Sequence, residues 1–393
     1  MQIEVSNAGV CVVLGNHRWT LEIPLLLVSG ALLIIGFIMV MSASMHLGEG
    51  GDSLFNYPVR QLVHILAGLF GAVLMLFVPL DVLEKSGHWL FLIGLALLVA
   101  VLIPGLGVKV NGSIRWLAVG GTRIQVSEII KLISVIYMAG YMTRHVQTVR
   151  TSVYGMIRPL ILLSFASILL LMEPDFGAAA VILITALALM FLGGARLWQF
   201  SVLVCLLGVL GMILIVTSPE RMERLTTFRD PWADPLDSGF QLTQSLIAFG
   251  RGEWFGVGLG SGLQKLYYLP EGHTDFLFAV IGEELGLFGV CVVIALFAFL
   301  VWRAFAIAKL ADQVGVEFAA YLGYGLGIWF GVQSAINMGV NMGMLPTKGL
   351  TLPLMSYGGG SMIVMCSAIG LLLRVYSEAV EQGRSGARGF WNG

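Results

Sequence analysis

Long apolar segments separated by short polar ones occupy most of this chain. Each run approaches the roughly 20 residues that a helix needs to cross the hydrocarbon core of a bilayer. The pattern predicts ten membrane-spanning helices, at roughly 21–43, 57–79, 87–104, 125–142, 158–173, 176–194, 197–217, 276–302, 317–343 and 352–375. One polar loop, 218–275, is much longer than the others.

The composition supports the same fold class. Of the 393 residues, 58% are hydrophobic and 11% are charged, and no water-soluble domain of this size can bury so much apolar surface. We therefore expect an all-α integral membrane protein, a polytopic bundle of about ten transmembrane helices with one large extracytoplasmic loop. The net charge of −1 argues against a nucleic-acid partner. The four scattered cysteines argue against a disulfide framework or a metal site.

The distribution of Lys and Arg orients these helices. An even number of spans places both chain ends on one side, and the short loops on that side are richer in Lys and Arg, as cytoplasmic loops are. This predicts a cytoplasmic N-terminal segment 1–20, a ten-helix domain 21–376 that includes the extracytoplasmic loop 218–275, and a cytoplasmic tail 377–393. Residues from Gln382 onward are expected to be disordered.

Asp275 ends the long loop, directly before the eighth predicted span. A carboxylate there can stay ionised in water and still reach a group held at the membrane surface. As a general base it would accelerate a reaction by about 10²–10⁴. The alternative is that Asp275 accepts hydrogen bonds from the first amides of the next helix, as cap residues do. From the spacing alone this alternative is favoured.

Glu128 and Lys131 are charged residues within the fourth predicted span. At a spacing of i and i+3 they share a helix face and can pair. Each charge costs about 2.5–3.5 kcal/mol at the centre of a membrane helix, so a polar cavity or a functional role is the first expectation. The alternative is a structural ion pair that fixes two helices.

Three cations fall in the predicted outer loops. Arg115 and Arg123 lie near Trp116 before the fourth span, and Lys348 lies in a Pro-containing turn before the tenth. Cations at an outer membrane surface suit a diphosphate, which Arg binds through two parallel hydrogen bonds. The alternative is that these charges are solvated and contact lipid headgroups.

The ninth predicted span carries Gln333, Asn337 and Asn341 at intervals of four residues, a polar stripe on one helix face. Glycines recur at the same interval on another face, at Gly323, Gly327 and Gly331. We expect the glycine face to pack tightly on a neighbouring helix. The amide face either lines a wet crevice or makes hydrogen bonds between helices, and the pattern does not separate the two.

Two patterns in the long loop are weaker. The glycines of 256–262 have the spacing of a phosphate-binding loop but lack its strand–helix context. Ser238 and Gln241 have the spacing of a capping box. They would open a short amphipathic helix, 240–249, whose apolar face could lie on the membrane surface.

Several motifs together resemble the SEDS (shape, elongation, division and sporulation) family of bacterial peptidoglycan glycosyltransferases. They are Asn111-Gly112-Ser113-x-Arg115-Trp116, Gln125-x-Ser127-Glu128-x-x-Lys131, Glu173-Pro174-Asp175-Phe176-Gly177, Leu269-Pro270-Glu271-x-His273-Thr274-Asp275-Phe276, Gly282-Glu283-Glu284-Leu285-Gly286 and Pro353-Leu354-x-Ser356-Tyr357-Gly358-Gly359. The resemblance runs from the first span to the last. Residues 228–232, 265–268 and 343–353 are most similar to the cell-division members of the family. The small departures, at Gly272, Gly282 and Gly360, touch no charged residue.

The resemblance implies a ten-helix enzyme that polymerises lipid II at the outer face of the bacterial inner membrane. It implies a class B penicillin-binding protein (FtsI) and other divisome proteins as partners, at the division septum. Asp275 would be the catalytic carboxylate. Substrate-binding residues are expected at Arg115, Arg123, Lys348, Glu128, Lys131, Glu271, His273 and Asn337. No cofactor is required by the sequence, although a divalent cation could share the phosphate role.

Two rival functions stay open. A lipid II flippase would also use intramembrane Glu128, Lys131 and the amide stripe, although the chain shows no inverted repeat. A scaffold would act only by activating its penicillin-binding partner. A polymerase needs one base and positive charge for the departing diphosphate, rather than the two carboxylates of a glycosidase. The residues of the predicted outer loops supply that set.

Overall fold

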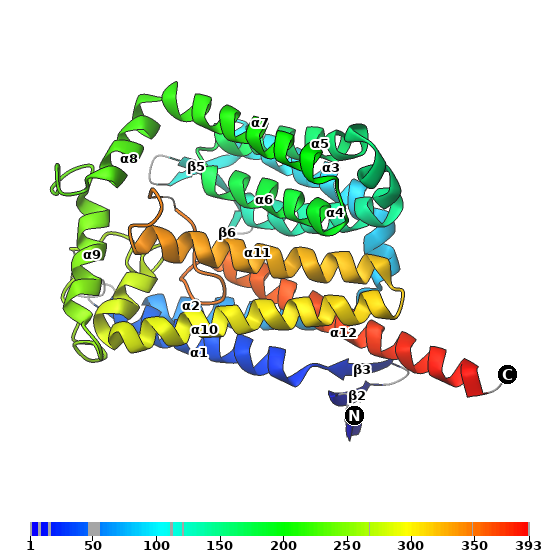
Figure 1. Cartoon of the computed structure of the whole chain (residues 1–393). Helices are drawn as coiled ribbons and strands as arrows, with labels where there is room; N and C mark the ends of the chain where they lie inside the picture. Colours follow the sequence, from blue (N-terminus) through cyan, green and yellow to red (C-terminus); the bar gives the residue numbers. More distant parts are fainter. Residues whose placement is uncertain are drawn as a thin grey trace.

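The computed structural model describes residues 2–6, 9–14, 17–45, 56–110, 113–119, 122–266, 268–347 and 349–391. Most of the described chain is a bundle of long helices lying side by side (Figure 1). These are α1 (Ile23–Ser44), α2 (Asn56–Phe77), α3 (Leu80–Leu102), α4 (Val126–Thr151), α5 (Val153–Met172), α6 (Phe176–Leu192), α7 (Leu197–Val216), α10 (Leu277–Gln313), α11 (Glu317–Asn341) and α12 (Gly359–Trp391). Two shorter helices, α8 (Pro219–Arg229) and α9 (Phe240–Gly252), belong to the long loop.

Each predicted span coincides with one of the long helices, so the polytopic helical fold is confirmed. Eight of the described helices are long and apolar enough to cross a membrane. Of the ten long helices, α6 and α11 are the two outside this set: α6 has only 17 residues, and α11 carries the polar amide stripe. In the structure α12 extends past the tenth predicted span to Trp391, and disorder from Gln382 onward stays a prediction.

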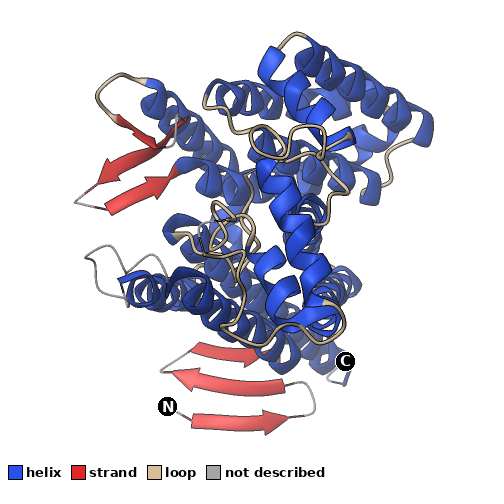
Figure 2. Cartoon of the chain, turned by 90° about the vertical axis from the view of Figure 1, so that its left-hand side faces the viewer, coloured by secondary structure: helices blue, strands red, loops and turns tan. Residues whose placement is uncertain are grey.

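Two small antiparallel sheets were not predicted (Figure 2). The first contains β1 (Gln2–Ser6), β2 (Gly9–Leu14) and β3 (His17–Leu21); the second contains β4 (Gly107–Val110), β5 (Ser113–Val119) and β6 (Thr122–Gln125). The strands have four to seven residues, so a search for membrane-length apolar runs passes over them. The all-α description therefore holds for the membrane-spanning part and not for residues 2–21 and 107–125.

The order of the elements gives the bundle two distinct ends. Both chain termini lie toward one end, which we call the terminal end, whereas α8 and α9 lie at the opposite end, which we call the loop end (Figure 1). Because successive helices alternate in direction, the sheet β4–β6, the turn after α5, the residues before α10 and the segment between α11 and α12 all meet at the loop end. Most of the predicted site residues lie in or beside these connections.

The glycine face of α11 packs on α10, as predicted. A Cβ atom added at Gly323 would lie 3.0 Å from the Cβ of Ala308, and one at Gly327 would lie 3.0 Å from that of Ala304. Any side chain at these positions would force the two helices apart. Glycine therefore sets the separation of α10 and α11.

The short helix predicted near residues 240–249 is present as α9, and it packs on α10. The predicted capping box is wrong. The N-cap is Gly239, with no side-chain cap bond. The hydroxyl of Ser238 instead donates to Asp234 and accepts a bond from Thr227.

Candidate active site

Asp275 does not cap the helix that follows it. The N-cap of α10 is Phe276, and no side-chain cap bond is made there in the described structure. The side chain of Asp275 is only partly exposed. The alternative of a simple helix cap, favoured by spacing alone, is therefore not what the structure shows.

The backbone of Asp275 is held by the amide stripe of α11. The amide nitrogens of Asn337 and Asn341 donate to the carbonyl oxygen of Asp275 across 2.8 Å and 2.9 Å. The amide oxygen of Asn341 accepts the backbone N–H of Ala279 at 3.1 Å. Asn337 also donates to the carbonyl of Leu350 at 2.5 Å. The stripe thus makes the inter-segment hydrogen bonds that the sequence left as one of two alternatives.

The surroundings of Asp275 raise the pKa of its carboxyl group to about 7. Burial is the largest cause, because a charged group loses hydration there. The nearby carboxylate of Glu271 raises the pKa further, whereas the guanidinium of Arg115 lowers it. A carboxylate with a pKa near neutrality is matched to general base catalysis.

Arg115 reaches toward Asp275 from β5. Its Nε atom donates to the carbonyl of Glu173 at 3.1 Å, and Nη2 donates to that of Pro174 at 2.6 Å. A Cβ added at Gly349 would lie 2.9 Å from Oδ2 of Asp275 and 4.0 Å from Nη1 of Arg115. Asp275, Arg115 and the backbone of Gly349 therefore converge at the loop end.

The two other predicted cations are placed only in part. Lys348 lies outside the described residues, although its neighbour Gly349 lies beside Asp275. The backbone of Arg123 belongs to β6, and its side chain lies outside the described part of the structure. Substrate binding by either cation stays a prediction.

Glu173 is a further candidate residue of the site, and it is not among the site residues predicted from the sequence. It follows the last residue of α5 and is fully buried, and neither of its carboxylate oxygens has a hydrogen-bond partner in the described structure. Burial, with a contribution from Asp175, raises the pKa of Glu173 to about 8. Asp175 itself caps α6 by accepting the N–H of Ala178 at 3.1 Å. The acidic pair around a proline was visible in the sequence, but its burial was not.

Glu128 and Lys131 form a buried ion pair, with 2.9 Å between Nζ and Oε1. Lys131 also donates to Oε1 of Gln333 at 2.7 Å, and Gln333 donates to the carbonyl of Thr351 at 3.0 Å. This confirms the pairing and links α4 through α11 to the segment before α12. A contact between either charged residue and substrate stays a prediction.

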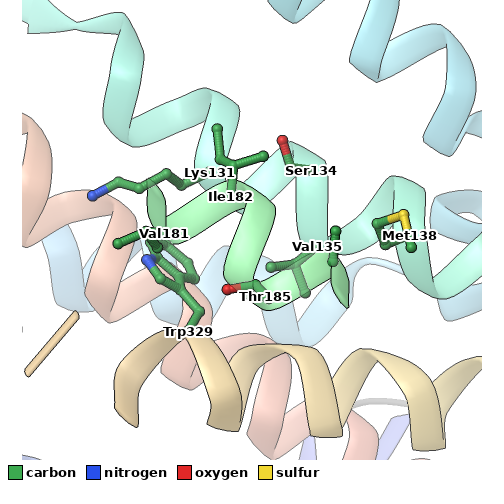
Figure 3. Close-up of a pocket in the computed structure, with 9 residues that line it drawn as sticks. Lys131, Ser134, Val135, Met138, Val181, Ile182, Thr185 and Trp329 are labelled. Atoms are coloured by element: carbon green, nitrogen blue, oxygen red, sulfur yellow. The ribbon is translucent and has the colours of Figure 1, made fainter. Parts of the chain in front are cut away.

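Next to Lys131 is a small cavity of about 10 Å³, lined also by Ser134, Thr185 and Trp329 (Figure 3). Figure 3 shows Lys131 and Trp329 extending from different helices toward the same region, and the Nζ atom lies 5.7 Å from the indole centroid. A cavity of this size holds about one water molecule. It offers no room for a saccharide or a lipid headgroup.

Glu271 and His273 belong to the segment before Asp275. A carboxylate oxygen of Glu271 accepts the hydroxyl of Thr274 at 2.7 Å. The imidazole of His273 packs against the rings of Tyr57 and Tyr357, with centroids 5.2 Å and 5.5 Å away. Burial lowers the pKa of His273, which favours a neutral ring. Both residues shape the segment, and their predicted contact with substrate is untested.

No metal site can be assigned to this region. Among the described residues, no group of three or more His, Cys, Asp or Glu side chains is arranged to hold a metal ion. The divalent cation considered from the sequence therefore stays untested.

A family model described as a cell cycle protein, covering FtsW, RodA and SpoVE, matches residues 23–381. A probable peptidoglycan glycosyltransferase FtsW from Methylococcus capsulatus is 61% identical over 388 residues, with 98% of this chain and 97% of that protein covered. Its counterpart from Methylomonas methanica is 59% identical over 374 residues, with 95% and 96% covered.

Solved structures show the same fold. One chain of a peptidoglycan synthase complex that coordinates polymerization and crosslinking aligns with a TM-score of 0.73 and 27% identity, covering 91% of this chain and 98% of its own. The rod shape determining protein RodA of Thermus thermophilus aligns with a TM-score of 0.66 and 27% identity, with 91% and 96% covered.

Proposed function

Since the chain belongs to the FtsW, RodA and SpoVE family of cell cycle proteins, we propose that it polymerises lipid II with Asp275 as the general base. Peptidoglycan glycosyltransferase activity follows from identity of 61% and 59% to proteins bearing that name over nearly the whole chain. Its apolar helices and these relatives make it a multi-pass protein of the inner membrane. The substrate and the role of each residue form the proposal.

In the proposed reaction, Asp275 removes the proton from the 4-hydroxyl of the acceptor saccharide. The hydroxyl oxygen attacks the anomeric carbon of the donor, and the bond from that carbon to the diphosphate oxygen breaks with inversion. Undecaprenyl diphosphate leaves with the electron pair. A pKa of about 7 for Asp275 supports this role, because the base must be ionised near neutral pH and still accept a proton.

The departing diphosphate needs positive charge. Arg115 is the cation whose charge lowers the pKa of Asp275, and Lys348 is the neighbour of Gly349. We assign diphosphate contacts to Arg115 and Lys348, with Arg123 as a further candidate. Charge-assisted hydrogen bonds from such groups stabilise the negative charge that develops in the transition state.

One observation carries the proposal: the convergence of Asp275, Arg115 and Gly349 at the loop end. It brings one carboxylate and one guanidinium together, with a backbone position that leaves open the space beside Oδ2. The flippase alternative receives less support. Lys131 is bonded to both Glu128 and Gln333, and the adjacent cavity of about 10 Å³ holds only one water.

We place the loop end outside the cell and the termini in the cytoplasm, following the positive-inside rule. We further propose a class B penicillin-binding protein (FtsI) and other divisome proteins as partners at the division septum. The similarity to a chain of a peptidoglycan synthase complex supports a partner of this class.

The test uses purified full-length protein in liposomes with fluorescent lipid II, with and without the penicillin-binding partner. Glycan strands made by the wild type, and lost in Asp275→Asn, are the expected result. Movement of lipid II between leaflets without strand formation would support the flippase instead. Polymerisation that requires the partner and is unchanged in Asp275→Asn would support the scaffold.

A further inference from the structure

The helix α10 is interrupted at Gly286 (φ 65°, ψ −165°). Residues 252–258, which we call the clasp, begin at the last residue of α9 and lie against this interruption. Four backbone hydrogen bonds join the two segments: Leu287 N–H to Glu253 O (2.9 Å), Phe288 N–H to Trp254 O (3.1 Å), Val257 N–H to Glu283 O (3.0 Å) and Gly258 N–H to Glu284 O (3.1 Å). The clasp thus satisfies the backbone groups that a broken helix leaves unpaired.

Glycine allows this close approach. A Cβ added at Gly256, where φ is 80°, would lie 2.1 Å from the carbonyl oxygen of Glu284. A Cβ added at Gly286 would lie 2.3 Å from the backbone nitrogen of Gly256. Side chains at either position would separate the clasp from α10.

Two fully buried carboxylates fix the chain around the clasp. Glu284 is bonded to Lys265 at 2.5 Å and to Ser42 at 2.8 Å. Glu283 pairs with Arg251 at 3.3 Å and accepts the N–H of Leu263 at 2.9 Å. The glycine-rich stretch therefore surrounds carboxylates of its own chain, and the Gly260 N–H also donates to Glu284 at 3.1 Å. A segment fastened in this way presents a fixed surface.

Two large aromatic side chains stand out on that surface, beside the exposed Glu253. Trp254 is 70% exposed and Phe255 is 82% exposed. The backbone carbonyls of Glu253 and Trp254 accept the N–H groups of Leu287 and Phe288 on α10, whose side chains are 44% and 66% exposed. Two large aromatic side chains held in the open on a rigid turn indicate a contact that the chain alone does not make.

The level of the clasp along α10 indicates which contact this is. Exposed apolar residues continue from Phe288 along α10 to Trp302, which is 58% exposed. The rise between these two residues is about 21 Å at 1.5 Å per residue, less than the roughly 30 Å of a hydrocarbon core. With Trp302 at the interface of the terminal end, the core extends past Phe288 toward the loop end. The clasp bonds to residues 283–288 of α10, so it spans the outer part of the core and its boundary with the headgroups.

We propose that Trp254 and Phe255 insert into this boundary, so that the clasp fastens the long loop to the lipid bilayer. The bilayer is the occupant because the aromatic pair continues the lipid-facing surface of α10. Aromatic rings favour this depth, where one side of the ring meets acyl chains and the other meets water.

The experiment measures tryptophan fluorescence of the full chain in nanodiscs whose lipids carry bromine near the carbonyl end of the acyl chain. Subtracting the spectrum of Trp254→Phe from that of the wild type isolates the emission of Trp254. The matched control is Trp232→Phe, since Trp232 is also an exposed loop residue but is not bonded to α10 in the described structure. Both substitutions keep an aromatic ring, and circular dichroism checks that the variants are folded.

We expect brominated lipid to remove most of the Trp254 emission and little of the Trp232 emission, whereas aqueous acrylamide quenches Trp232 more strongly. Equal quenching of the two residues by brominated lipid would overturn the proposal. Loss of the Trp254 quenching when a class B penicillin-binding protein is added would also overturn it, because the aromatic pair would then belong to a protein interface. Glycosyltransferase activity does not enter these readouts, so they are independent of the proposed role of Asp275.

Discussion

The side chain of Asn341 binds the backbone of Asp275 and not its carboxylate: the amide nitrogen of Asn341 lies 2.9 Å from the backbone carbonyl oxygen of Asp275. The amide oxygen of Asn341 fixes the first turn of α10 through Ala279. The position of residue 275 is thus set by contacts that do not depend on its side chain. This separation allows the carboxylate to be changed without moving the backbone.

We expect Asp275→Asn to lower the rate of glycan polymerisation by at least ~10²-fold, because the base is lost while size and backbone contacts are kept. Single-turnover assays with labelled lipid II measure the rate. The folded protein should be recovered in normal yield. Near-normal strand synthesis would refute the assignment of Asp275 as the base.

The variant Asp275→Asn also tests how the stability of the folded protein depends on pH. The pKa of Asp275 is raised in the folded protein, from 3.8 to about 7. Its favourable contribution to folding is therefore present below the unfolded pKa and is lost as pH rises through about 7. Asp275→Asn should have a higher unfolding temperature than the wild type at pH 8, with a smaller difference at pH 5. A lower unfolding temperature at pH 8 would contradict this.

The pH profile of activity tests the neighbours of Asp275. Activity should rise with pH through about 7, as Asp275 loses its proton. Glu271→Gln removes a charge that raises the pKa and should move the rise to lower pH. Arg115→Gln removes a charge that lowers the pKa and should move the rise to higher pH. The position of the rise is measured, and shifts of both variants in one direction would contradict the electrostatic assignment.

Lys131 is expected to be more important for folding than its position inside one helix suggests. Lys131→Met leaves the buried carboxylate of Glu128 unpaired, which should cost about 3–5 kcal/mol of unfolding free energy. Adding Glu128→Gln should restore part of that loss. Thermal unfolding in detergent measures both effects. Recovered stability without activity would indicate a role in the reaction, whereas recovery of both would indicate a purely structural pair.

Glu284 offers a graded test of the contacts that fix the long loop. Ser42→Ala removes one hydrogen bond to Glu284 and should cost about 0.5–1.5 kcal/mol. Lys265→Met leaves the buried carboxylate without its cation and should cost several times more. Limited proteolysis should show faster cleavage within residues 251–268 in Lys265→Met than in Ser42→Ala. Equal cleavage would argue against Glu284 as the anchor.

Lys348→Gln tests the diphosphate assignment. Loss of one charge-assisted contact should reduce kcat/KM for lipid II roughly 10–150-fold. This factor corresponds to about 1.5–3 kcal/mol of lost transition-state stabilisation. Arg115→Lys should retain only part of the activity, because paired guanidinium bonds are lost. If these cations contacted only headgroups, the effects should instead depend on the anionic lipid content of the bilayer. Unchanged kinetics in Lys348→Gln would count directly against the assignment.

Apolar runs were sufficient to locate the helices, since a membrane helix must be apolar over nearly its whole length. They could not reveal β4–β6, because short strands produce no such run. The i+4 spacing placed Asn337 and Asn341 on one face but could not show that both amides bond to a carbonyl more than 60 residues away. The burial of Glu173 likewise depends on segments brought together only by folding.

Gly349 imposes a constraint of a different kind from the charged residues around it. A methyl group at this position would lie within 2.9 Å of Oδ2 of Asp275, so the carboxylate would have to turn away from it. We therefore expect substitutions of the proposed catalytic residue Asp275 to disturb the structure less than substitutions of Gly349. The residue proposed to perform the chemistry can be replaced without disturbing the fold, whereas the residue without a side chain accepts no substitution that leaves the carboxylate in place.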